Sequence, residues 1–262
     1  MTVHTAYQQG TPCWVDLQTS DQEAAKAFYG QLFGWDYDDR PMPQGGPYSM
    51  ALLGGRTVAA IAPQTPDQAA AGAPPMWNTY LAVDDVDAST ALVSDAGGQV
   101  AMEPFDIQDS GRMSYVADPS GAYVGLWQAG THLGAQLTNE PGAVTWNELV
   151  TADGAQALPF YEKVLGVQTV TVPMGPDFSY TMFQVGERQV AGSTAPQMDG
   201  VPNHWNVWFE VASVDETAAR IRDLGGELVV EPQDMPVGRM AVARDPQGGY
   251  FNLLQPAPQP EA

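Results

Sequence analysis

Two predicted strands of this 262-residue chain each carry a carboxylate two residues after a tryptophan. Asp16 follows Trp14, and Glu148 follows Trp146. Side chains two positions apart lie on one face of a strand, so each carboxylate shares a face with its tryptophan. A carboxylate on such a face can give a proton to a bound molecule or take one from it. Asp16 and Glu148 are therefore the candidate catalytic residues.

Aromatic and amide side chains of other predicted strands fall on the same faces. They are Asn78, Tyr80, Tyr123 and Trp127 in the first half, and Tyr180, Asn206, Trp208, Glu210, Tyr250 and Asn252 in the second. Apolar rings with a few polar groups are the usual lining of a small-molecule pocket, which makes these residues candidates for substrate binding. The alternative is that the rings fill a closed barrel, because aromatic residues are common in strands for packing alone.

The second half carries more polar groups on this face than the first. Glu210 stands where the first half has an alanine, and Asn252 where it has a glycine. Two carboxylates in one small cavity repel each other, so the pKa of one should be raised. The second cavity is therefore the better candidate for proton transfer, or for capture of a hard cation by Glu148, Glu210, Asn206 and Asn252. Alternatively, Glu210 reaches solvent at the end of its strand.

The elements that position these side chains occur twice. Residues 14–34 (WVDLQTSDQEAAKAFYGQLFG) predict a strand, a capped helix and a glycine stop, and residues 146–166 (WNELVTADGAQALPFYEKVLG) repeat this layout 132 positions later. Ser20 and Glu23 have the spacing of a capping box. Gly34 suits the left-handed residue that ends a helix. Two such copies indicate a duplicated unit.

Further matches extend the repeat along the chain. Trp205 corresponds to Trp77 with an offset of 128, because the proline-rich linker predicted at residues 63–75 is shorter in the second half. The order of strands and helices predicts four βαβββ units in two pairs. We therefore expect an α+β fold with two tandem domains, residues 1–131 and 132–262, each with eight strands and two main helices.

Three pairs of segments resemble a known family. AAKAFYGQLFGW and ALPFYEKVLGV follow the first strand of each half, VDDVDASTALVSDAGG and VASVDETAARIRDLGG lie in the middle, and DPSGAYVGLWQ and DPQGGYFNLLQ lie near the ends. With these segments the chain resembles the vicinal oxygen chelate superfamily, which includes glyoxalase I, bleomycin-resistance proteins and extradiol dioxygenases. The likeness covers nearly the whole chain and is nearest to two-domain actinobacterial proteins labelled glyoxalase or hydroxylase. It implies that each pair of units forms an open, U-shaped barrel around a cavity.

Enzymes of this superfamily hold a divalent metal with one His or Glu from each of four strands. The matching positions are Trp14, Ala60, Asn78 and Gly125 in the first half, and Trp146, Gly192, Asn206 and Asn252 in the second. None is His, Asp, Glu or Cys, and an amide oxygen alone is a weak ligand. We therefore expect no metal and no other cofactor.

The hypothesis is a protein that binds a small, partly aromatic organic molecule and either sequesters or converts it. The alternatives are a metal-dependent lyase, isomerase or dioxygenase with displaced ligands, and a structural or interaction protein with plugged barrels.

Composition limits the partners. The chain has 31 acidic and 10 basic residues, a net charge of -21, and this charge disfavours nucleic acid and anionic membranes as partners. One cysteine, no signal-peptide pattern and no long apolar run predict a cytoplasmic protein. Pairing of two domains within one chain replaces the dimer of single-domain relatives, so we expect a monomer or a weak homodimer.

Five basic residues remain as minor candidates. His4, His132 and His204 do not have the spacing of metal ligands, and a surface role is the simpler interpretation. Arg112 and Arg239 both follow a glycine in a predicted hairpin. They bind an anionic ligand at the mouth of the cavity, or they stabilise the turn, or they pair with Asp118 and Asp245.

Overall fold

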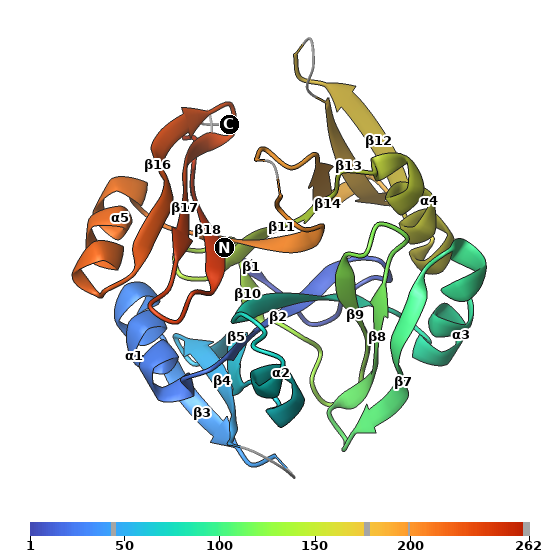
Figure 1. Cartoon of the computed structure of the whole chain (residues 1–262), viewed down its shortest axis with the longest axis horizontal. Coiled ribbons are helices and arrows are strands. Elements are labelled where there is room, and N and C mark those ends of the chain that lie inside the picture. The colour runs from blue at the N-terminus through green and yellow to red at the C-terminus, as the bar shows by residue number, and fades with distance from the viewer. Residues whose placement is uncertain (43–45, 176–178, 199, 259–262) are drawn as a thin grey trace.

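The computed structural model describes residues 1–42, 46–175, 179–198 and 200–258 (Figure 1). Its strands form two eight-stranded sheets and a two-stranded ribbon. In spatial order, the first sheet contains β3 (Asp36–Arg40), β4 (Tyr48–Leu53), β5 (Arg56–Pro63), β2 (Pro12–Thr19), β6 (Met76–Ala82), β9 (Tyr123–Ala129), β8 (Gly111–Ala117) and β7 (Gln99–Ile107). The second contains β12 (Gln168–Pro173), β13 (Ser179–Val185), β14 (Arg188–Thr194), β11 (Val144–Val150), β15 (His204–Glu210), β18 (Tyr250–Pro256), β17 (Gly238–Arg244) and β16 (Glu227–Met235). The ribbon pairs β1 (Thr2–Val3) with β10 (Leu137–Thr138).

The helices lie beside the sheets. They are α1 (Gln22–Phe33), α2 (Pro66–Ala70), α3 (Val86–Ala91), the 3₁₀ helix η1 (Ser94–Ala96), α4 (Gly154–Leu165) and α5 (Val214–Asp223). In each sheet the first strands of the two units pair antiparallel, β2 with β6 and β11 with β15, and each pairs in parallel with the last strand of its own unit. The edge strands of each sheet do not pair with each other in the described residues, so the sheets stay open. The predicted α+β fold of two tandem, open, eight-stranded units is confirmed.

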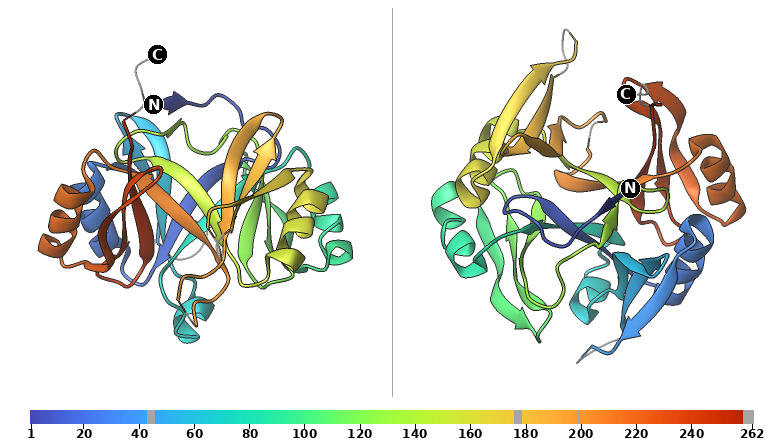
Figure 2. Two further views of the ribbon diagram at one scale, coloured as in Figure 1. Left: turned by 90° about the horizontal axis from the view of Figure 1, so that it is seen from above. Right: turned by 180° about the vertical axis from the view of Figure 1, so that it is seen from behind.

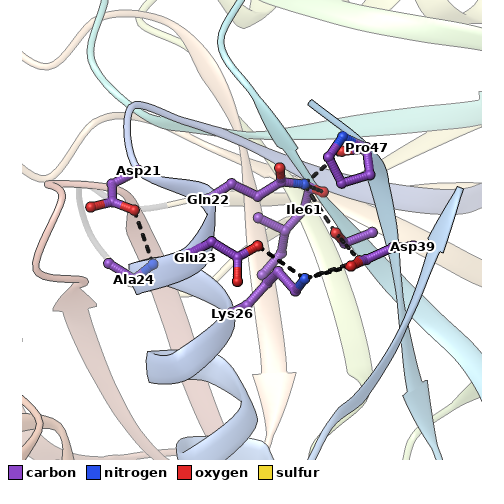
Figure 3. Close-up of polar contacts among 9 residues, drawn as sticks. Asp21, Gln22, Glu23, Ala24, Lys26, Asp39, Pro47 and Ile61 are labelled. Carbon is purple, nitrogen blue, oxygen red and sulfur yellow. Dashed lines mark hydrogen bonds and ion pairs between the residues drawn. The ribbon is translucent and has the colours of Figure 1, made fainter. Parts of the chain in front are cut away.

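The start of α1 differs from the prediction (Figure 3). Asp21, and not Ser20, is the N-cap residue, and its Oδ1 accepts a hydrogen bond from the backbone N–H of Ala24 at 3.0 Å. Glu23 forms an ion pair with Lys26 at 3.1 Å. The predicted capping box at Ser20 and Glu23 is therefore wrong, because an aspartate one residue later serves as the cap.

Side chains in the first turns of α1 attach the helix to its sheet. The amide nitrogen of Gln22 donates to the backbone oxygens of Pro47 at 2.7 Å and Ile61 at 2.8 Å (Figure 3). Lys26 also forms an ion pair with Asp39 on β3 at 2.9 Å. These contacts fix the helix over β3, β4 and β5.

The predicted linker at residues 63–75 contains a short helix, α2. Thr65 caps it and forms a reciprocal capping box with Gln68, and Pro66 takes the first turn, where its missing N–H costs nothing. The composition of this stretch did not predict a helix, although local capping alone can start one.

The two sheets stand back to back (Figures 1 and 2). Their central strands β6 and β15 are in contact, and Asn147 on β11 donates a hydrogen bond to Thr79 on β6 at 3.0 Å. Helix α1 lies beside α5, and α3 lies beside α4, so each helix pair contains one helix from each half. The concave faces of the sheets therefore point in opposite directions (Figure 1).

A buried tyrosine joins the two halves on each side. The hydroxyl of Tyr29 on α1 donates to Asp245 of the second half at 2.9 Å and accepts from Trp77 at 3.1 Å. The repeat produces the same contact in the opposite direction, because Tyr161 on α4 donates to Asp118 of the first half at 2.8 Å. Each half thus supplies a helix that completes the polar network of the other.

The described residues contain no helix of the length and apolar character that a membrane crossing requires.

Candidate functional site

The first concave face is the side of the first sheet that carries Trp14, Asp16, Asn78 and Tyr80. Asp16 is 3% exposed and accepts three hydrogen bonds there. The donors are the Tyr48 hydroxyl at 2.9 Å, the Asn78 amide at 2.8 Å and the Tyr80 hydroxyl at 2.9 Å. Burial raises the pKa of Asp16, and these three donors oppose that rise. The carboxyl group is fully engaged by the protein itself.

A further row of polar groups completes this network. Trp14 Nε1 donates to the Tyr48 hydroxyl at 2.8 Å. Tyr115 donates to Asn78 at 2.7 Å, and its ring stacks on Tyr123, which is 47% exposed. Tyr123 therefore lies at the rim of the first concave face.

The segment of residues 130–136, here called the cover segment, lies over the first concave face. The ring of His132 packs edge-on against Trp14 and Trp127, with centroid distances of 4.5 and 5.7 Å. Trp127 Nε1 donates to the backbone oxygen of His132 at 3.0 Å, and Tyr7 donates to that of Ala135 at 2.7 Å. Burial, aided by the charge of Arg40, lowers the pKa of His132 to about 4, so this ring is neutral. A cavity of about 100 Å³ remains beside the cover segment, lined by Arg40, Thr57, Thr131, His132, Leu133, Gly134 and Gln136.

The second concave face is the side of the second sheet that carries Trp146, Glu148, Asn206 and Trp208. Glu148 is 8% exposed and accepts a hydrogen bond from the Tyr180 hydroxyl at 2.8 Å. Trp146 Nε1 donates to the same hydroxyl at 2.8 Å. This Trp–Tyr–carboxylate chain repeats the one at Asp16. The strand register places Asn206 directly opposite Glu148.

Two donors of the first face have no equivalent in the second. The position of Tyr80 is taken by Trp208, and that of Tyr115 by Val242. Burial raises the pKa of Glu148, and Tyr180, Asn206 and Trp208 oppose this rise. Although the indole N–H of Trp208 acts on the carboxyl group, Nε1 is buried and forms no hydrogen bond with any described residue. Glu148 is therefore less completely engaged than Asp16.

The second concave face is also less covered. Trp14, Met50 and Trp127 are buried in the first half. Their counterparts Trp146, Met182 and Leu254 are each only half-buried. The cover segment lies over the first face and not over the second, which explains the difference. The two carboxyl groups themselves are both buried, at 8% exposure for Glu148 and 3% for Asp16, so the difference in cover concerns the side chains around them.

Glu210 lies apart from this group, whereas Asn252 on β18 stands directly opposite Trp208 in the strand register. The pKa of Glu210 is raised by partial burial and responds to the N-terminal amine, Thr145 and Glu140, but not to Glu148. Asn252 is buried and donates to the backbone of Val207 at 3.3 Å. The structure thus brings Glu148 and Asn206 together but places Glu210 elsewhere. Tyr250 is 52% exposed and lies under the guanidinium of Arg244, at the rim.

The metal positions of the superfamily do not fit a metal in this chain. A Cβ atom at Gly125 would overlap the ring of Tyr80, and one at Gly192 would overlap the hydroxyl of Tyr180. The tyrosines occupy the space in which a ligand side chain from those strands would stand. No group of three or more His, Cys, Asp or Glu side chains in the described part of the chain could hold a metal ion.

Sequence reasoning missed several residues of the two faces. His204 contacts Asn206 Oδ1 through Nε2 at 2.9 Å and the backbone oxygen of Pro202 through Nδ1 at 2.7 Å, so it lies at the edge of the second face. The alternation of His204, Asn206 and Trp208 along one strand could have shown this. Tyr48 could have been found from its offset to Tyr180. The position of His132 had no such signal.

The two hairpin arginines face helices and not a cavity. Arg112 forms ion pairs with Asp87 on α3 at 2.8 Å and with Asp106 at 3.0 Å. Arg239 forms the matching pair with Asp215 on α5 at 2.8 Å. The structure therefore favours the turn-stabilising role over anion binding. The alternative of pairs with Asp118 and Asp245 is wrong, because those two carboxyl groups accept hydrogen bonds from Tyr161 and Tyr29 instead.

The comparisons with known proteins agree with this architecture. The sequence profile of the Glyoxalase/Bleomycin resistance protein/Dioxygenase superfamily matches residues 11–126 and 134–253. The chain belongs to this superfamily. It is 54% identical over 261 residues to "Putative glyoxylase CFP32" of Mycobacterium tuberculosis, which covers 99% of this chain and 100% of that protein. It is 37% identical over 262 residues to the anthracycline biosynthesis protein DnrV of Streptomyces peucetius, with 96% and 95% covered.

Solved structures show the same fold at low identity. The Mn(II)-bound glyoxalase from Novosphingobium aromaticivorans superposes with a TM-score of 0.65 at 18% identity, over 95% of this chain and 83% of that one. The 2,2',3-trihydroxybiphenyl 1,2-dioxygenase of Sphingomonas wittichii gives 0.64 at 16% identity, over 95% and 91%. At these identities the likeness concerns the fold alone.

Proposed function

We propose that the second concave face binds a small, partly aromatic organic molecule and that Glu148 exchanges a proton with it. The observation that carries this proposal is the contrast between the two carboxyl groups. Asp16 accepts three hydrogen bonds beneath the cover segment, whereas Glu148 accepts one in an open face, beside an indole N–H without a partner. A face on which a carboxyl group and a buried N–H are incompletely satisfied by the protein is suited to a ligand.

The chemistry of Glu148 supports a role in proton transfer. Burial raises its pKa, and a raised pKa makes a carboxyl group better able to hold a proton and to exchange it with a bound molecule. A positioned general acid or base accelerates a reaction by roughly 10²–10⁴-fold. Tyr180, held by Trp146, fixes the carboxyl group in place. The side chains at the superfamily's metal positions do not fit a metal, so the proposed proton transfer uses the protein's own groups.

The relatives support an organic ligand. One is named as a glyoxylase and another as a protein of anthracycline biosynthesis, so proteins similar to this chain are linked to small organic molecules. In this proposal the first half acts as a scaffold. The rings of its concave face, together with the cover segment, fill the position of a ligand.

The test compares Glu148→Gln with the matched substitution Asp16→Asn. Native mass spectrometry of the purified protein first identifies a co-purified small molecule, and the same measurement is then made on both variants. We expect Glu148→Gln to weaken ligand retention or turnover by at least tenfold and Asp16→Asn to leave both unchanged. If Glu148→Gln is silent while Asp16→Asn abolishes function, the proposal has the wrong face.

A further inference from the structure

We infer that the ligand of the second concave face is an uncharged carbonyl compound whose oxygen accepts a hydrogen bond from Trp208 Nε1. This inference rests on the proposed function and adds the chemical class of the ligand to it.

The indole nitrogen of Trp208 differs from those of the other tryptophans. The chain has seven tryptophans. Six of them donate from Nε1 to an oxygen of the protein, namely Trp14, Trp35, Trp77, Trp127, Trp146 and Trp205. Trp208 is 8% exposed, and its Nε1 has no partner among the described residues. Buried polar groups in folded proteins are nearly always paired, so this nitrogen is a candidate contact for a ligand.

The chemistry of the nitrogen restricts the ligand atom. An indole N–H donates and never accepts, so the ligand must present an acceptor. In the first half Tyr80, at the same position, donates to Asp16 and is thereby satisfied. With tryptophan at this position the donor still acts on the carboxyl group, since it opposes the rise in the pKa of Glu148, but Nε1 forms no hydrogen bond with any described residue.

The neighbouring carboxyl group restricts the ligand further. Glu148 lies beside Trp208, and a carboxyl group with a raised pKa can hold a proton and act as a second donor. A protonated Glu148 and the Trp208 N–H would together offer two donors, which match the two lone pairs of a carbonyl oxygen. His204 is the one basic group in the described residues whose charge acts on Glu148, and it is half-buried at the edge. An anionic ligand would lack a countercharge next to Glu148, so an uncharged ligand fits better.

The other side chains of the second concave face provide flat and apolar contacts. Trp146 and Tyr180 present ring surfaces, and Met182, Val242 and Leu254 are half-buried on the same side of the sheet. Such a lining fits the aromatic part of a ligand. The combined surface therefore favours an aryl ketone or a related compound over a saturated or charged one.

Three probes of nearly equal shape test the inference. 2-Acetylnaphthalene carries a neutral carbonyl, 2-ethylnaphthalene lacks an acceptor, and 2-naphthoate carries an acceptor with a negative charge. Isothermal titration calorimetry should show that the ketone binds about tenfold more tightly than the hydrocarbon, which is the gain expected from one or two neutral hydrogen bonds. The naphthoate should bind more weakly than the ketone. Equal affinity for ketone and hydrocarbon, or tightest binding of naphthoate, would overturn the inference.

Two variants locate the contact. Trp208→Phe should remove most of the preference for the ketone, and Tyr80→Phe at the matching position of the first half should preserve it. A second readout uses the unchanged protein, so that it does not depend on how a variant folds. In a ¹H–¹⁵N spectrum, the indole resonance of Trp208 should move downfield with 2-acetylnaphthalene and not with 2-ethylnaphthalene. A ketone that shifts other indole resonances but not this one would contradict the assigned contact.

The same data separate this inference from the proposed function. If both uncharged probes bind equally and Glu148→Gln weakens both, the second concave face is a binding site but the carbonyl class is wrong. If none of the probes binds, or if binding does not respond to Glu148→Gln, the proposed function fails as well.

Discussion

Removal of the Tyr29 hydroxyl should destabilise the whole protein. This hydroxyl is buried between the two halves, where it donates to Asp245 and accepts from Trp77. Tyr29→Phe leaves both partners without their contact in a site that water does not reach. A hydrogen bond to a charged group contributes about 1.5–3 kcal/mol and a neutral one about 1 kcal/mol, which gives a loss of about 3 kcal/mol in the free energy of unfolding.

The assay is urea unfolding followed in parallel by circular dichroism and tryptophan fluorescence. In thermal unfolding of a protein of this size, a loss of 3 kcal/mol in the free energy of unfolding corresponds to a fall in Tm of roughly 6–10 °C. Tyr37→Phe is the matched control, because the Tyr37 hydroxyl is also buried but has no hydrogen-bond partner in the described residues. The control should stay within about 0.5 kcal/mol of the unchanged protein. If Tyr29→Phe is no more destabilising than Tyr37→Phe, the buried Tyr–Asp contact does not hold the halves together.

Three further predictions concern single side chains. The pKa of Glu148 is higher in the folded than in the unfolded protein, so stability should fall as the pH rises from the unfolded value of about 4.3 to the folded pKa. Glu148→Gln should remove this part of the slope, and a pH-independent difference in urea midpoint between variant and unchanged protein would contradict it. Gly192→Ala should weaken ligand binding, because its Cβ would displace the Tyr180 hydroxyl, whereas Gly175→Ala has open space and should be silent in calorimetry. Arg112→Gln should leave the urea midpoint nearly unchanged, because its ion pairs are exposed to solvent, and a clear fall in the midpoint would show that the hairpin depends on them.

The architecture could be predicted from the sequence because the same order of strand and helix patterns occurs twice along the chain. The period-2 alternation around Asp16 and Glu148 correctly separated the helix-packed side of each strand from the opposite side. The offset between the copies placed Trp208 at the position of Tyr80, which the strand register supports. Patterns of this kind depend on local backbone geometry, so they can be recognised in a single sequence.

The positions of segments and side chains in the tertiary structure were harder to predict from the sequence. The cover segment passes over the first concave face because of its path after β9, and nothing in its composition indicates that His132 meets Trp14. The alternation along β15 assigned Glu210 to the same cavity as Glu148, but strand length carries it to the other end of the sheet, near the N-terminus. The direction of an indole N–H, on which the site at Trp208 depends, is likewise decided by packing.

The reciprocal Tyr–Asp contacts have a consequence for how such a chain can arise and change. Asp118 and Asp245 are equivalent in the repeat, so two copies of an ancestral half could form the same interface as a symmetric homodimer. Fusion of the two copies into one chain makes that interface permanent. The two halves are then free to differ in sequence. Since the concave faces point outward and away from the interface (Figure 1), mutations in one do not disturb the other. In one half a segment of the chain can then cover the aromatic rings, while the concave face of the other half stays accessible.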